Sequence, residues 1–462
     1  MARRMKDLTQ GSITGHILQM AAVMVIGMVG QTLYYLVDLY FVSGLGPQAI
    51  AGVSVAGNIT FVVLALTQIL NVGTAALISH AAGRKDQHDA NVVFNQSLVL
   101  SGLVGLFVLL AGYLLTRPFL DLIGADAGSR QAGVTYLYWF MPGLALQFAM
   151  VSMGAALRGT GIVRPTMTVQ VLTVLLNVAL APVLIAGWGT GRPMGVAGAG
   201  LASTLAIVAG VVMLTGYFER LEKYVGFHRE QWSPQLLYWK RILNIGLPAG
   251  GEFAVMFLLM GLSYWLIRGF GSEAQAGYGI GSRVMQAIFL PAMAIAFSAA
   301  PVAGQNFGGR HALRVRATFR AAVLLETAIM AVILLFCQIA PGSLIAAFTH
   351  DERVISVGTD FLRIISWNFI ASGIIFTCSG MFQAMGNTWP ALLSGVSRLV
   401  IFAVPTIWLS YQPGFTLRQV WVTSVITVAL QAVLSFVLVQ WEMRKKLAFQ
   451  PATLANPAVP AL

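Results

Sequence analysis

Three acidic residues stand inside stretches of the sequence that are otherwise apolar: Asp38, Glu252 and Glu326. An uncompensated carboxylate inside a bilayer costs at least about 2.5–3.5 kcal/mol, so acids in such places are candidate functional groups. Glu326 has no polar stripe beside it, and we expect a hydrogen-bonded or interfacial group outside the site. Asp38 and Glu252 are therefore the candidates for moving cations across a membrane.

Asp38 has the clearest pattern around it. Gln31, Tyr34 or Tyr35, and Asp38 recur at helical spacing and form one polar and aromatic stripe on an apolar helix. Such a stripe is expected to face a cavity rather than lipid. A carboxyl group among apolar neighbours resists ionisation, which suits it to take up a proton on one side and release it on the other. The alternative is a carboxyl group held by neighbouring hydroxyls, with no part in transport.

The elements that carry these acids are long apolar runs, each near the roughly 20 residues that a helix needs to cross a bilayer. Of 462 residues, 57% are hydrophobic and only 10% are charged, which is too little charge for the surface of a soluble domain. Twelve spans are expected, at roughly 15–42, 50–80, 91–115, 131–157, 163–187, 195–217, 241–268, 276–306, 315–340, 356–384, 389–410 and 417–441. The sequence therefore predicts an all-α membrane protein.

The net charge of +12 follows the expected topology. With the N-terminus inside, nineteen Lys and Arg residues fall in cytoplasmic segments and six in the opposite loops. This bias is the positive-inside rule, so the basic charge reports orientation and does not indicate a nucleic-acid partner.

An internal repeat divides the chain into two halves. The segment 44–52 recurs as 269–277, and Gly161 recurs as Gly386 at the same offset along the chain. Six spans is an even number, so both copies share one orientation, with a pseudo-two-fold axis along the membrane normal and a central cavity between two six-helix lobes.

This repeat sets the domain boundaries. We expect a cytoplasmic N-terminal segment at 1–14, an N-lobe at 15–217, a cytoplasmic interlobe loop at 218–240, a C-lobe at 241–441 and a cytoplasmic tail at 442–462.

Glu252 does not occupy the position equivalent to Asp38. Its counterpart in the first half is Gly27, whereas the counterpart of Asp38 is Ser263. The two acids are thus eleven residues apart on equivalent helices, or roughly 16 Å in depth, with Glu252 toward the cytoplasm. Glu252 is either a second carboxylate for protons or cationic substrates, or an acid paired with Arg283 or Arg398.

Other chemistry finds no support in the sequence. No Lys is followed by Ser or Thr, so the phosphate-binding Walker A motif is absent. Six scattered His and two Cys within apolar spans offer no metal or catalytic cluster. We therefore expect no enzymatic activity, no metal site and no cofactor other than the coupling ion.

Several of these segments resemble a known family. The stretch from Gln31 to Gly46, the segment 154–165, the turn 386–388 and the segment 246–248 are similar to multidrug and toxic compound extrusion (MATE) transporters, and the resemblance runs from about residue 8 to 445. It implies twelve helices in two lobes with alternating access, and efflux of drugs or toxins in exchange for protons or sodium ions.

The resemblance also implies a cation site in the N-lobe. Asp38 matches its acid, Asn177 its asparagine on the fifth helix, and Ser203 or the adjacent Thr204 its hydroxyl on the sixth. Ala181 stands where a second acid is expected. Sodium prefers several hard oxygen ligands, and the tenth span offers no carboxylate around Asn368, so proton coupling is favoured over sodium.

Two sets of residues are thus predicted to do the work. The expected coupling residues are Asp38, Asn177, Ser203 and Tyr35. The expected substrate-binding residues are Gln31, Tyr35, Met153, Glu252, Met256, Arg283, Asn368 and Arg398. The methionines among them supply adaptable apolar surface for loosely specified ligands.

The prediction is a proton-coupled multidrug antiporter. We expect it in the inner (plasma) membrane with both termini in the cytoplasm, working as a monomer on small organic substrates. The alternatives are a lipid-linked oligosaccharide flippase, which calls for a strongly cationic cavity, and a polytopic membrane enzyme, which calls for a catalytic acid or histidine cluster.

Overall fold

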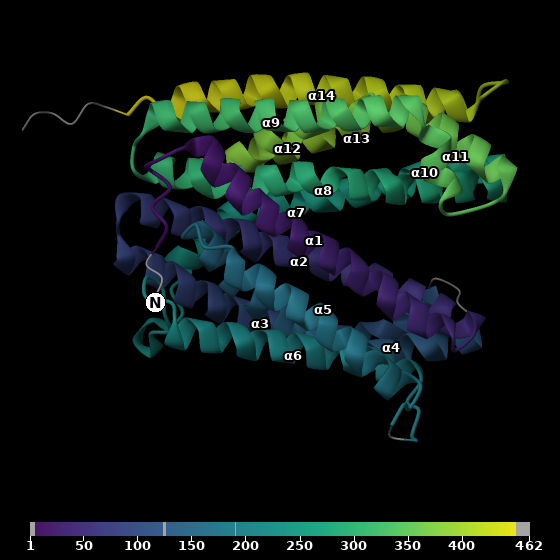
Figure 1. The fold of residues 1–462 in the computed structure, drawn as a ribbon, viewed down its shortest axis with the longest axis horizontal. Helices are drawn as coiled ribbons and strands as arrows, with labels where there is room; N and C mark the ends of the chain where they lie inside the picture. Colours follow the sequence, from purple (N-terminus) through teal and green to yellow (C-terminus); the bar gives the residue numbers. More distant parts are fainter. Residues whose placement is uncertain (1–4, 123–125, 190, 450–462) are drawn as a thin grey trace, which may run out of the picture.

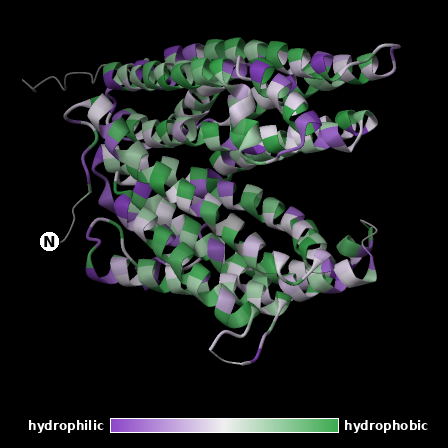
Figure 2. Cartoon of the chain, turned by 45° about the vertical axis from the view of Figure 1, so that its right-hand side comes forward, coloured by the Kyte–Doolittle hydropathy of each residue, from purple (hydrophilic) through white to green (hydrophobic). Residues whose placement is uncertain are grey.

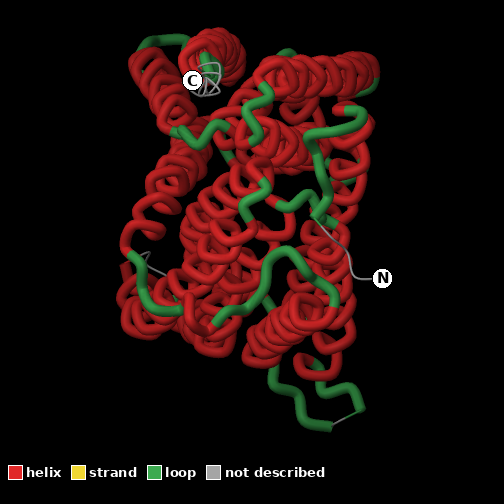
Figure 3. Tube along the Cα trace, turned by 90° about the vertical axis from the view of Figure 1, so that its left-hand side faces the viewer, coloured by secondary structure: helices red, strands yellow, loops and turns green. Residues whose placement is uncertain are grey.

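The computed structural model describes residues 5–122, 126–189 and 191–449, without the side chains of Tyr34, Tyr35, Leu36, Asp38 and Leu39. This part of the chain is built of helices joined by loops, and it contains no strand (Figure 3). The helices are α1 (Ile13–Ser43), α2 (Pro47–Arg84), α3 (Gln87–Leu122), α4 (Ala127–Gly159), α5 (Arg164–Ile185), α6 (Val196–Arg220), η1 (Arg229–Gln231), α7 (Leu236–Ile267), η2 (Arg268–Phe270), α8 (Ser272–Gly308), α9 (Ala312–Ile339), α10 (Pro341–Ala346), α11 (Glu352–Ile365), α12 (Asn368–Ala384), α13 (Trp389–Ser410) and α14 (Leu417–Lys446).

Eleven of the helices in the described residues are long and apolar enough to cross a membrane. The short helices α11 and α12 form the twelfth span as a pair, bent by 56° at the residues between them. The twelve predicted spans are thus confirmed, and the tenth is broken rather than straight. Large apolar side chains such as Leu114 and Leu335 stay exposed on the outer faces, as expected for contact with lipid.

Two sets of helices lie one above the other in Figure 1, with α2 to α6 below and α8 to α14 above. Four turns repeat between the sets, each with a positive φ and each at the offset of the sequence repeat. The pairs are Gly46 (101°) and Gly271 (94°), Lys85 (59°) and Arg310 (60°), Gly161 (79°) and Gly386 (67°), and Gly189 (75°) and Gly414 (81°). The repeat in the sequence is therefore a repeat of backbone conformation. We call α1–α6 the N-lobe and α7–α14 the C-lobe.

Helix α1 touches both lobes. Its first half, with Ile17, Met20 and Met24, packs against Ala294 and Ile295 of α8. Its second half lies along α5 of the N-lobe, because Gly30 is in contact with that helix. Figure 1 shows α1 crossing between the two sets of helices.

The two lobes meet at one end of the molecule, which we call the closed end. There α2 is buried at every residue from 72 to 82, and α8 at every residue from 301 to 306. Toward the other end, α2 and α8 show exposed residues again, and the upper and lower helices separate in Figures 1 and 2. The N-terminal segment lies at the closed end.

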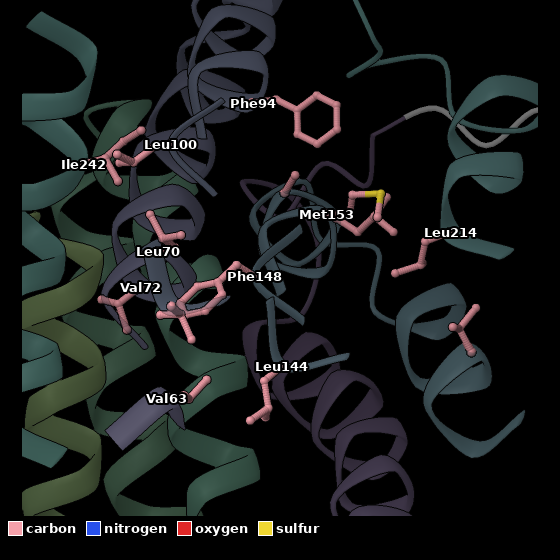
Figure 4. Close-up of a cluster of buried hydrophobic side chains, with 14 of the residues drawn as sticks. Val63, Leu70, Val72, Phe94, Leu100, Leu144, Phe148, Met153, Leu214 and Ile242 are labelled. Atoms are coloured by element: carbon pink, nitrogen blue, oxygen red, sulfur yellow. The ribbon is translucent and has the colours of Figure 1, made fainter. Parts of the chain in front are cut away.

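Each lobe has its own apolar core. In the N-lobe, Val63 and Leu70 of α2, Phe94 of α3 and Phe148 of α4 pack together (Figure 4). In the outer part of the C-lobe, Tyr278, Phe361 and Trp421 form an aromatic cluster with ring centroids 4.9–5.5 Å apart. These cores fix the helices on which the polar groups of the next section are held.

Candidate coupling and substrate site

A polar pair is buried between α5 and α6 of the N-lobe. Asn177 Nδ2 donates a hydrogen bond to Ser203 Oγ over 3.4 Å, and both residues are fully buried. Asn177 Oδ1 has no partner in the described part of the chain. The alternative hydroxyl, Thr204 Oγ1, instead donates to the Trp139 carbonyl at 2.6 Å. Ser203 rather than Thr204 therefore accompanies Asn177.

Only part of the predicted N-lobe site can be placed. The side chains of Tyr35 and Asp38 lie outside the described residues, and Gln31 is half-buried on α1. Ala181, one turn beyond Asn177, is fully buried and apolar. The structure thus brings together Asn177 and Ser203 and offers no second carboxylate on α5.

Glu252 of α7 is held by α12. Ser379 Oγ donates to Glu252 Oε2 over 2.8 Å, and Gln383 Nε2 lies 3.5 Å from Ser379 Oγ. No ion pair among the described residues joins Glu252 to Arg283 or Arg398. Arg283 is exposed on α8, and Arg398 Nε has no partner within the described chain. The arginine pairing considered from sequence is therefore wrong, because a hydroxyl on α12 takes that place.

Glu326 of α9 is buried deeper than Glu252. It is 0% exposed, and Thr377 Oγ1 donates to its Oε2 over 2.5 Å. Glu326 Oε1 has no partner among the described residues. Thr377 and Ser379 are two residues apart on α12. Thr377 donates to Glu326 and Ser379 donates to Glu252, so each hydroxyl of this helix holds one carboxyl group. Glu326 is therefore as strong a candidate as Glu252 for a functional carboxyl group. The sequence around Glu326 does not show this, because its hydroxyl partner lies on α12.

The residues expected to bind substrate are dispersed. Met153 is only 2% exposed, in the core of the N-lobe with Leu214 (Figure 4), and so does not line a cavity here. Met256 on α7 is 52% exposed. Asn368 begins α12 at the bend in the tenth span, and its Oδ1 has no partner among the described residues.

Arg158 lies near the end of α4, at a helix end where the positive-inside rule predicts a cytoplasmic charge. The structure shows that it links the two lobes. Its Nη2 donates to Asn71 Oδ1 over 2.9 Å, and its guanidinium carbon lies 5.7 Å from the centre of the Phe297 ring on α8. Arg158 lies in the segment 154–165 that resembles the family, but the sequence alone does not show its contact with the C-lobe.

Comparison with known proteins identifies the fold and the family. The MatE family model matches residues 24–183 and again residues 248–409. Probable multidrug resistance protein YoeA of Bacillus subtilis is 24% identical over 416 residues, covering 87% of this chain and 88% of the relative. Multidrug export protein MepA of Staphylococcus haemolyticus is 25% identical over 399 residues, covering 84% and 85%.

Solved structures show the same arrangement of helices. An outward-facing conformation of a multidrug resistance MATE family transporter superposes with a TM-score of 0.90 at 24% identity, covering 96% of this chain and 99% of that one. A transporter of the MOP superfamily from Pyrococcus furiosus gives 0.89 over the same shares. The two matches to the family model together span more than half of this chain. The chain therefore belongs to the MatE family of multidrug efflux transporters.

Proposed function

We propose that this transporter exports small organic molecules, many of them cationic, in exchange for a cation that enters along its gradient, by alternating access between the two lobes. The observation that carries the proposal is that the described carboxyl groups inside the spans are hydrogen-bonded to hydroxyl groups. Glu252 and Glu326 accept hydrogen bonds from Ser379 and Thr377 and form no ion pair with an arginine in the described chain. A carboxylate paired with arginine is fixed as an anion, whereas one beside a hydroxyl can gain and lose a cation.

The position of residue 38 supports a coupling site in the N-lobe. Gly30 of α1 faces Val171 and Val174 of α5. Both helices run in the same direction, so a point eight residues further along α1 lies about 12 Å further out and level with 179–182 on α5. Asn177 and Ser203 lie near that level, and the unpaired Asn177 Oδ1 is available to a cation or a proton donor. Tyr35, one turn before Asp38, completes the proposed coupling set.

A proton fits this set better than sodium does. Sodium prefers several hard oxygens, and the fully buried Ala181 provides none. One proton crossing 100 mV releases about 2.3 kcal/mol. That energy supports a concentration ratio of roughly 40–50-fold for the exported compound.

The proposed orientation places the closed end in the cytoplasm, because Arg84, Lys85, Arg310 and Arg314 lie there. Both termini are then cytoplasmic, in a monomer within the plasma membrane. Substrate would meet Gln31, Met256 and Glu252 first, with Arg283, Asn368 and Arg398 further along the C-lobe. The chain acts as a transporter and requires no cofactor beyond the coupling ion.

The test is Asp38→Asn in proteoliposomes loaded with a fluorescent organic cation. We expect proton-driven efflux to be abolished while thermal unfolding stays that of the wild type, because the variant keeps the shape of the side chain and loses its charge. Efflux at the wild-type rate would remove Asp38 from the mechanism. Proton and sodium gradients imposed separately on the wild type identify the coupling ion, and efflux driven by sodium alone would overturn proton coupling.

A further inference from the structure

Two residues at the closed end are equivalent in the repeat and make equivalent bonds to the opposite lobe. His80 of α2 and Gln305 of α8 are related by the same offset as the repeated segments. His80 Nε2 lies 2.6 Å from the Ala384 carbonyl oxygen of the C-lobe. Gln305 Nε2 donates to the Gly159 carbonyl of the N-lobe over 3.0 Å. A carbonyl only accepts, so His80 Nε2 carries the hydrogen in this contact.

The two acceptors are also equivalent. Gly159 ends α4 and Ala384 ends α12, and the repeat relates these two positions as well. Carbonyl groups in the last turn of a helix have no partner within that helix. His80 of the N-lobe therefore donates to the end of α12 in the C-lobe, and Gln305 of the C-lobe donates to the end of α4 in the N-lobe. The two bonds are related by the pseudo-two-fold axis.

The backbones around these bonds are in direct contact. A Cβ on Gly83 would overlap the backbone oxygen of Gln305, and one on Gly308 would overlap that of His80. Gly304 likewise faces Ser79, its own equivalent in the repeat. Gln305 is 0% exposed and His80 is 9% exposed, so both bonds are made in a largely buried place.

We propose that these crossed hydrogen bonds form a latch that holds the closed end shut, and that both break each time this end opens. The inference rests on the proposed alternating access, because the latch matters only if the end opens. A variant that closes this end without one of the donors leaves the opposite carbonyl buried and unpaired, which shifts the balance toward the open state by about tenfold or more.

The two halves of the latch differ in what else they hold. Gln305 Oε1 accepts a hydrogen bond from Leu8 N over 2.9 Å, so its amide also secures the N-terminal segment. His80 instead lies against the Phe307 ring, with centroids 5.1 Å apart. The bond to Ala384 needs only an N–H at the distance of Nε2. A glutamine at position 80 provides that donor, and an asparagine is one carbon too short.

The experiment compares His80→Gln with His80→Asn in the full chain in lipid nanodiscs. Spin labels at His88→Cys and Leu313→Cys, two exposed equivalent positions beside the closed end, report the distance between the lobes. Cys337 and Cys378 are buried and stay in place. We expect His80→Gln to keep the short wild-type distance, and His80→Asn to raise the population at longer distance about tenfold.

An unchanged distribution in His80→Asn, or the same opening in both variants, would overturn the latch. If His80→Asn does not fold, Gln305→Asn tests the other bond with the same labels and the same expected shift. These distances are measured without substrate or gradient. The label distances therefore test the latch separately from transport. If they shift as expected but the protein exports no compound, the latch stands and the proposed antiport is wrong.

Discussion

At the scale of single residues, one atom in the N-lobe stands out. Asn177 Oδ1 is buried and has no partner in the described chain, although its amide nitrogen is bonded to Ser203. A buried polar atom without a partner costs about 1–3 kcal/mol. Such an atom in an otherwise apolar contact between α5 and α6 is consistent with an oxygen reserved for a transported cation or for a protonated neighbour.

Replacing Asn177 by alanine should therefore impair coupling more than folding. We expect Asn177→Ala to lower proton-driven efflux at least about tenfold, since one good hydrogen bond to a charged partner is worth about that factor. Thr204→Val is the matched control, because this adjacent hydroxyl bonds to the Trp139 carbonyl instead. Efflux from proteoliposomes measures both, and equal losses in the two variants would contradict a special role for Asn177.

Glu222, in the loop after α6, predicts a pH effect on stability. Burial raises the pKa of this carboxyl above its usual value, and its Oε2 has no partner among the described residues. A raised pKa means that the folded state prefers the protonated acid, so stability is lost as the pH rises through that pKa. Glu222→Gln should raise the melting temperature above that of the wild type at pH 7.5, and this difference should shrink toward pH 4.5. Glu219 is an exposed neighbour, so Glu219→Gln should change the melting temperature little. If Glu222→Gln and the wild type melt at the same temperature at both pH values, the raised pKa of Glu222 is wrong.

The candidate site could be predicted from the sequence only where its residues form a pattern on one helix or match a segment of the family. The stripe on the first span predicts Asp38, whose side chain lies outside the described residues, and the family resemblance predicts Asn177 and Ser203. The partners of Glu252 and Glu326 lie 127 and 51 residues away on α12, and no local pattern links them. Met153 lies in the core because an apolar, adaptable side chain suits a core as well as a cavity, and the sequence does not tell the two apart.

At the scale of helices, α2 and α8 pack closely enough to exclude side chains at their crossing. Gly83→Ala should lower the melting temperature, because its Cβ would overlap the Gln305 backbone. Gly102→Ala on α3 is the control, since its Cβ would meet no atom within 4 Å. Alanine is favoured over glycine in a helix by about 1 kcal/mol, so the control should be neutral or stabilising. A stabilised Gly83→Ala variant would show that the helices are further apart than described.

Hydropathy located every span but could not show that the tenth is bent. The apolar run 356–384 reads as one helix, with no proline at the break. The structure supplies the cause from elsewhere in the chain. Gln338 of α9 donates to the Arg363 carbonyl and to Ser366 Oγ, each over 2.7 Å. A side chain from a neighbouring helix thus satisfies a backbone group at the kink, which no local rule reveals.

At the scale of the whole molecule, the two ends should move in opposite directions. Ser43 and Arg268 are exposed, equivalent positions at the end away from the closed end. In a transporter that alternates, spin labels there should come closer in the His80→Asn variant, while the labels at His88 and Leu313 separate. Double electron–electron resonance in nanodiscs measures both pairs. Separation at both ends would indicate that the lobes dissociate rather than rock.

The N-terminal segment gives the cycle a natural reporter. Lys6 N donates to the Thr160 carbonyl of the N-lobe over 3.1 Å, and Asn306 Nδ2 of the C-lobe donates to the Leu8 carbonyl over 3.2 Å. Leu8 itself is 0% exposed. This short strap cannot stay attached to both lobes once they part, so one set of its bonds is released in each cycle of the proposed alternating access. A protease or an antibody directed at residues 5–9 from the side of the closed end would then reach its target only while that end is open.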